Sequence, residues 1–83
     1  MATFNFVPIG DYTTCCYSSF KEEVDNRTYS TATHDIERIL RSEYAFDEPR
    51  KFSFIEESGC YMVSLEAGVK GDAWTQTWRA YPL

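Results

Sequence analysis

The spacing of apolar residues changes once along the chain and predicts a single helix. In residues 31–44 the apolar residues recur at steps of three and four, and charged residues fill most of the positions between them. The apolar set is Ala32, Ile36, Ile39, Leu40 and Tyr44. Side chains at this spacing share one face of an α-helix. We therefore expect a helix over 31–44, capped by Ser30 or Thr31, ended before Pro49 and packed on a sheet through this stripe.

The charged residues of this helix suit its two ends. Asp35 is expected in the first turn, near the positive end of the helix dipole, whereas Arg38 and Arg41 lie toward the negative end. Glu37 precedes Arg41 by four residues, which is the favourable order for an ion pair on a helix surface. We expect these two side chains to pair.

After the helix the pattern alternates with period two, which is typical of half-buried strands. We expect strands over 51–57, 60–66 and 73–81, the first two joined by a two-residue turn at Ser58 and Gly59. Alternation divides the residues of each strand between two faces. The residues that share the more apolar face are Phe52 and Phe54; Tyr61, Val63 and Leu65; and Trp74, Gln76, Trp78 and Ala80.

Before the helix the pattern is less uniform. Residues 3–7 alternate, with Phe4 and Phe6 on one side, and predict a first strand that ends in a turn after Pro8. Residues 12–20 are rich in strand-forming Thr, Cys, Tyr and Ser and predict a second strand, followed by a polar connection over 21–30. A helix over 12–24 is the alternative, since Tyr12, Cys16, Phe20 and Val24 are also four residues apart.

Together these elements predict one α+β domain spanning residues 1–83, with one helix on a small antiparallel sheet in the order ββαβββ. An apolar fraction of 43% and an aromatic fraction of 17% favour a packed globular chain over a disordered one. No run approaches the roughly 20 apolar residues of a membrane span, and the N-terminal residues lack the pattern of a secretory signal. We expect a cytoplasmic protein without a membrane partner.

The charge of the chain narrows the choice of partner. Thirteen acidic and eight basic residues give a formal net charge of -5 and an isoelectric point near 4.7. Such a surface repels a phosphate backbone, so direct binding of nucleic acid is disfavoured. It attracts a basic protein, and the surfaces that hold nucleic acid are the commonest basic surfaces in a cell. The alternative is that the charge only keeps a small protein soluble.

The sequence offers no pattern of a reaction centre, a cofactor or a metal. His34 is the only histidine, and no spacing pairs it with a nucleophile. Cys15 and Cys16 are adjacent and point to opposite faces if they lie on a strand, which argues against a zinc site shared with Cys60 and His34. We expect three free thiols, no cofactor, no bound metal and no enzymatic activity.

Paired carboxylates and tyrosines are the candidates for a binding surface. The acidic doublets are expected at exposed positions, where they form either a solvated rim or, together with Asp25, Asp35 and Glu43, an acidic patch that docks on a basic groove. Tyrosines left outside the core are typical of interfaces, because each brings contact area at a low cost in entropy. The predicted partner-binding residues are Glu22, Glu23, Asp25, Asp47, Glu48, Glu56, Glu57, Tyr17 and Tyr81.

In size, acidic charge and element order the chain resembles the small acidic inhibitors that bacteriophages encode against bacterial defence, including the anti-CRISPR proteins. Several of these pair one helix with a short antiparallel sheet. The resemblance implies a protein that occupies the surface on which a target enzyme holds its guide or its DNA. It rests on no motif and assigns no role to an individual residue.

The leading hypothesis is thus a non-enzymatic, stoichiometric inhibitor that docks on a basic nucleic-acid-handling protein such as a CRISPR effector. One alternative is an immunity protein or antitoxin against a nuclease. Another is a phage accessory or structural subunit that associates with itself. For the first two we expect a monomer or a weak homodimer.

Overall fold

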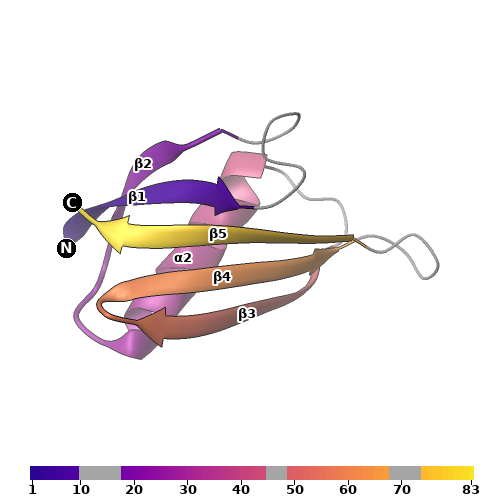
Figure 1. Cartoon of the computed structure of the whole chain (residues 1–83). Helices are drawn as coiled ribbons and strands as arrows, with labels where there is room; N and C mark the ends of the chain where they lie inside the picture. The colour runs from indigo at the N-terminus through magenta and orange to yellow at the C-terminus, as the bar shows by residue number, and fades with distance from the viewer. Residues whose placement is uncertain (10–17, 45–48, 68–73) are drawn as a thin grey trace.

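The computed structural model describes residues 1–9, 18–44, 49–67 and 74–83. Within them one helix packs on a five-stranded antiparallel sheet of strand order β2-β1-β5-β4-β3 (Figure 1). The predicted α+β class and the ββαβββ order are confirmed. Along the chain the elements are β1 (Ala2–Ile9), β2 (Phe20–Val24), α2 (Tyr29–Tyr44), β3 (Pro49–Glu57), β4 (Cys60–Ala67) and β5 (Trp74–Pro82).

The first and last strands lie side by side at the centre of the sheet. Phe6 of β1 is opposite Ala80 of β5, and the Leu83 amide donates a hydrogen bond of 3.0 Å to the Thr3 carbonyl. The two termini therefore lie at the same end of the sheet (Figure 1). β2 and β3 form its two edges, and the connection from one edge to the other runs through α2.

One face of the sheet and one face of the helix form the core, as the two periods predict. The alternating residues of β1, β4 and β5 that point toward α2 are buried, and so are four of the five predicted stripe residues of the helix; the side chain of the fifth, Tyr44, lies outside the described set. The buried apolar residues are Phe4, Phe6, Val24, Ala32, Ile36, Ile39, Leu40, Tyr61, Val63, Leu65, Trp78 and Ala80. Among the described residues one polar side chain, that of Gln76, is also buried. Its amide group donates a hydrogen bond of 3.0 Å to the Ile9 carbonyl.

The helix begins two residues earlier than the sequence predicts, and its cap is Thr28 rather than Ser30 or Thr31. The Thr28 hydroxyl accepts a hydrogen bond from the Thr31 amide, and the Thr31 hydroxyl accepts one from the Thr28 amide, both at 3.1 Å. This reciprocal pair satisfies two amides at the start of the helix. The prediction that Asp35 lies in the first turn was wrong for the same reason. Its carboxylate instead accepts a hydrogen bond from the Asp25 amide at 2.9 Å.

The second strand lies closer to the helix along the chain than predicted. Phe20–Val24 forms β2, at the start of the stretch that the sequence indicated as a connection, whereas residues 12–17 of the predicted strand fall outside the described residues. β2 pairs only with β1 among the described strands, so it needs few buried side chains. Only Val24 is fully buried and Phe20 half-buried, which explains why the polar residues between them concealed a strand.

The hairpin of β3 and β4 is confirmed with its predicted turn. Ser58 and Gly59 have φ values of 51° and 83°, the left-handed values that a type I′ turn requires at both central residues. The strands on either side are in register, with Glu57 opposite Cys60 and Phe54 opposite Val63. This turn fixes which residues of β3 face the helix and which face the open side of the sheet.

Candidate functional site

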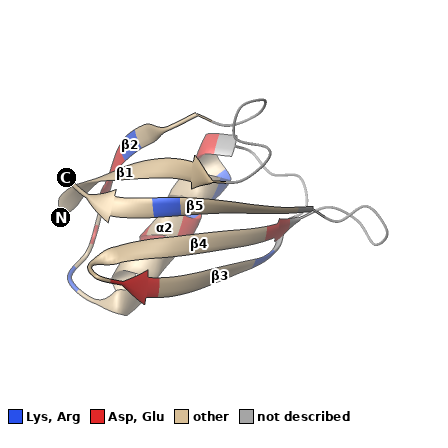
Figure 2. Cartoon of the chain, in the orientation of Figure 1, with Lys and Arg blue, Asp and Glu red and all other residues tan. Residues whose placement is uncertain are grey.

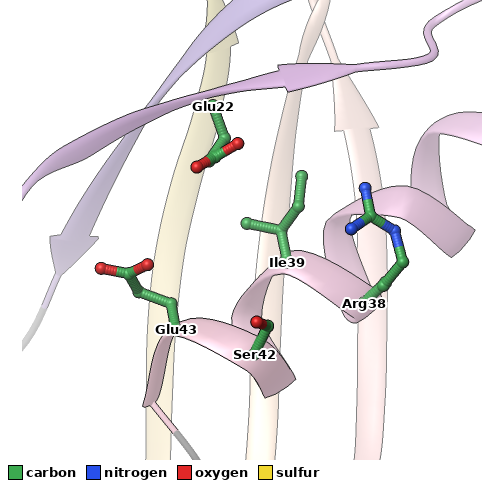
Figure 3. Close-up of a pocket in the computed structure, with 5 residues that line it drawn as sticks. All are labelled: Glu22, Arg38, Ile39, Ser42 and Glu43. Atoms are coloured by element: carbon green, nitrogen blue, oxygen red, sulfur yellow. The ribbon is translucent and has the colours of Figure 1, made fainter.

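A small hollow lies between the edge strand β2 and the last turns of α2. Its volume is about 80 Å³, and it is lined by Glu22, Arg38, Ile39, Ser42 and Glu43. Glu22 points from β2 toward the helix, while Ile39 and Glu43 point from the helix toward β2 (Figure 3). Ile39 is 4% exposed and forms an apolar floor between the two carboxylates. The hollow therefore combines negative charge at its rim with an apolar base.

The register of β2 explains why Glu22 faces the helix. Glu22 is opposite Phe4 of β1, and Phe4 is part of the core beneath α2. Residues opposite each other in a sheet point to the same face, and neighbours along a strand point to opposite faces. The adjacent Glu23 therefore lies on the open face, so the strand separates the two members of this doublet.

The two glutamates of the hollow are not neutralised by the arginine beside them. The Arg38 guanidinium pairs with Asp35, with 3.5 Å between Nε and Oδ1. Within the described part of the chain, Glu22 and Glu43 form neither an ion pair nor a hydrogen bond. A lysine or arginine of another protein can place its cationic end beside these two carboxylates.

The Asp25 carboxylate is already paired with an arginine of the same chain. Its carboxylate accepts hydrogen bonds from the Arg27 side chain at 2.8 and 2.6 Å. These bonds to Arg27 hold the pKa of Asp25 at about 2, below its usual value near 3.8. The pair orders the residues before the helix, and an internal partner makes Asp25 a poorer contact for another protein than Glu22.

The doublet at the end of β3 is also divided between the two faces. Glu56 is opposite Tyr61 on the helix side, and Glu57 lies exposed on the open face. Burial raises the pKa of the Tyr61 hydroxyl, and the hydrogen bond to Glu56 adds to that shift. The Tyr29 ring lies 6.1 Å from that of Tyr61, between centroids. Glu56 therefore supports an aromatic cluster, while Glu57 faces solvent.

Tyr81 lies half-buried on the open face of the sheet, where its hydroxyl accepts a hydrogen bond of 2.7 Å from the Asn5 side-chain amide. Among the side chains that the structure describes, the charges on this face balance, because strand alternation places three basic and three acidic residues there: Lys21, Lys51, Arg79, Glu23, Glu57 and Glu66. Strands β1 and β5, near the centre of the sheet, contain a single charged residue, Arg79 (Figure 2). The acidic excess of the described residues is therefore not on this face.

The helix side of the molecule carries the excess among the described charges. Its acidic residues are Glu22, Asp25, Asp35, Glu37, Glu43 and Glu56, and its basic residues are Arg27, Arg38 and Arg41. The predicted pair of Glu37 and Arg41 is present, with 3.2 Å between Oε2 and Nε. All three arginines therefore have an internal carboxylate partner. The three acidic residues left over are Glu22, Glu43 and Glu56.

Three predicted partner-binding residues, Tyr17, Asp47 and Glu48, lie outside the described residues, as do Cys15 and Cys16. His34 is exposed on the helix, and Cys60 is a half-buried free thiol. In the part of the chain that the structure covers, no group of three or more His, Cys, Asp and Glu side chains is placed to hold a metal ion.

The sequence analysis grouped Glu22 and Glu43 in one acidic patch but did not indicate which members of that patch lie at the same hollow. These two residues are far apart in the sequence, and the register of β2 and the direction of α2 bring them to the same hollow. The signal available was the alternation of Phe20, Glu22 and Val24, which places Glu22 on the side of the two apolar residues.

Among the described helical residues, none forms a segment long and apolar enough to cross a bilayer. Comparison with protein-family models, with curated proteins and with solved structures found no match.

Proposed function

We propose that this chain is a non-enzymatic binding protein that inhibits a basic nucleic-acid-handling protein, such as a CRISPR effector, by covering the surface that holds its guide or DNA. The observation that carries the proposal is the unneutralised acidic excess on the helix side, with Glu22 and Glu43 at the rim of one small hollow. A protein that imitates the charge of nucleic acid needs carboxylates that its own cations do not occupy.

The physical basis is electrostatic steering followed by contact. Unpaired carboxylates attract a basic surface before contact and raise the rate of association, and salt weakens this attraction. After contact, the carboxylates of Glu22 and Glu43 pair with the cationic end of a basic side chain. The inhibitor and the nucleic acid then compete for the same cations of the partner.

The experiment has two steps. Affinity capture from a bacterial lysate, followed by mass spectrometry, identifies the partner. The purified partner is then titrated with the chain in the presence of labelled guide or DNA. We expect the chain to displace the nucleic acid at a one-to-one ratio of inhibitor to partner sites.

Single charge reversals locate the surface. Glu22→Lys and Glu43→Lys are expected to raise the Kd for the partner at least tenfold each. Glu66→Lys is the matched control, because it makes the same change in charge at an exposed position of the open face. Circular dichroism shows that each variant is folded. A ternary complex of chain, partner and nucleic acid, or an equal loss of binding in the control, would refute the proposal.

A further inference from the structure

β3 presents a free edge of the sheet. Among the described strands it pairs with β4 alone. Residues that flank a two-residue turn form a hydrogen-bonded pair, so Glu57 bonds to Cys60, and alternate residues back along β3 bond to β4 as well. The amides and carbonyls of Phe52, Phe54 and Glu56 therefore point away from β4. In agreement, the Tyr29 hydroxyl reaches the Phe54 carbonyl from outside, at a long 3.5 Å.

The two edges of the sheet differ in how they are protected. β2 is five residues long and carries Lys21, Glu22 and Glu23 at its middle, which is a common way to prevent pairing with another chain. β3 is nine residues long and has its charges toward the ends, with Phe52 to Ile55 between them. Ile55 is 64% exposed on the open face. The middle of β3 is thus available to another strand once the Tyr29 hydroxyl leaves the Phe54 carbonyl.

The charges at the two ends of β3 have opposite signs. Lys51 and Glu57 are both exposed and both face the open side of the sheet. An antiparallel copy of the same strand brings the lysine end of one chain to the glutamate end of the other. A strand of this kind is complementary to itself.

We propose that β3 pairs with β3 of a second copy of the chain, antiparallel and with Phe54 opposite Phe54, to form a continuous sheet. Lys51 of each chain then lies opposite the partner's Glu57, once at each end of the interface. The outward backbone groups of Phe52 and Glu56 meet those of the partner's Glu56 and Phe52. A slide of two residues, the smallest that keeps the outward groups paired, places Lys51 opposite Ile55 or Gly59 and removes the ion pairs.

The helix side of the interface favours the same register. The Arg41 guanidinium lies over the Phe52 ring, 4.9 Å from its centroid. In the proposed pairing the partner's Glu56 is opposite Phe52, so it approaches Arg41. Opposite charges therefore meet on both faces of the joined sheet. The pairing involves β3, the edge opposite β2, and leaves the hollow at β2 free (Figure 1). It does not depend on the proposed function.

The test is a measurement of mass against concentration by analytical ultracentrifugation. The unaltered chain is expected to form a dimer. Lys51→Glu and Glu57→Lys, taken singly, place like charges opposite each other and are expected to raise the dimer Kd at least tenfold. An equimolar mixture of the two variants restores both opposite-charge pairs, so it is expected to dimerise as well as the unaltered chain. Lys21→Glu and Glu23→Lys, which make the same changes on β2, are the controls and should leave the Kd unchanged.

Hydrogen exchange identifies the edge independently. The amides of Phe52, Phe54 and Glu56 are expected to become protected as the protein concentration rises, because they are bonded only in the dimer. A chain that stays monomeric at millimolar concentration would overturn the proposal. So would variants that do not recover when mixed, or a dimer in which these three amides exchange freely.

Discussion

The helix covers the two halves of the sheet unequally. On the β2 side, Val24, Leu40 and Phe4 are at most 1% exposed. On the β3 side, Phe52 and Phe54 are only half-buried against the core, and Ile55 of the open face is 64% exposed. α2 crosses behind the sheet at an angle to the strands and is joined to the edge strand β2 by a short connection (Figure 1).

This difference indicates a division of roles. The β2 edge buries Val24 completely, and the surface beside it carries the unneutralised carboxylates Glu22 and Glu43. The β3 edge has no fully buried residue among its described side chains and retains backbone groups and rings that another strand can cover. The proposed partner surface is therefore at one edge of the sheet, and the proposed self-association is at the other.

The largest expected effect compares one substitution in the two halves. Phe4→Ala is expected to lower the free energy of unfolding by about 3–5 kcal/mol, because the ring is fully buried. Phe54→Ala is expected to cost less, about 2–3 kcal/mol, since this ring is only partly buried against the core. Urea unfolding of both variants, at a concentration that keeps the chain monomeric, measures the two values. Equal losses would mean that the halves are packed alike.

A smaller effect is expected at the start of the helix. Thr28→Ala removes the hydroxyl that caps the Thr31 amide and should lower the free energy of unfolding by about 1 kcal/mol. Ser30→Ala is the control, because Ser30 is exposed and lies within the first turn. If Ser30→Ala costs more than Thr28→Ala in the same urea titration, the helix begins where the sequence predicted.

The smallest effect is the pH dependence that Asp25 contributes. Its pKa is about 2 in the folded chain and about 3.9 in an unfolded one. A lowered pKa stabilises the folded state above the unfolded value, and this contribution is lost as the pH falls from about 4 toward 2. The loss is small because the pair with Arg27 is exposed to solvent. Asp25→Asn should make unfolding less sensitive to pH in that range, and an unchanged pH profile would contradict the pairing.

Elements that bury a face could be predicted from the sequence. The helix stripe of Ile36, Ile39 and Leu40, and the alternation in β4 and β5, are visible because the buried positions are apolar, with Gln76 as the exception. The turn at Ser58 and Gly59 was predictable because both residue types are common in turns and glycine accepts positive φ. The start of the helix was misplaced because four Ser and Thr residues between 28 and 33 could each act as a cap.

The candidate site depends on information that a linear pattern does not contain. β2 is an edge strand with one fully buried side chain, so its polar residues do not distinguish it from a loop. Without that strand, nothing places Glu22 beside Glu43. In the two doublets that the structure describes, the strand directs neighbouring side chains to opposite faces, so Glu22 and Glu56 lie on the helix side and Glu23 and Glu57 on the open face.

The most direct test of the proposed function is the salt dependence of partner binding. The Kd for the captured partner is measured at several potassium chloride concentrations for the unaltered chain and for the Glu22→Lys, Glu43→Lys double variant. Binding by unneutralised carboxylates predicts a Kd that rises steeply with salt and a much weaker rise, from a higher starting Kd, in the double variant. A Kd that is the same for both proteins and does not change with salt would contradict the account.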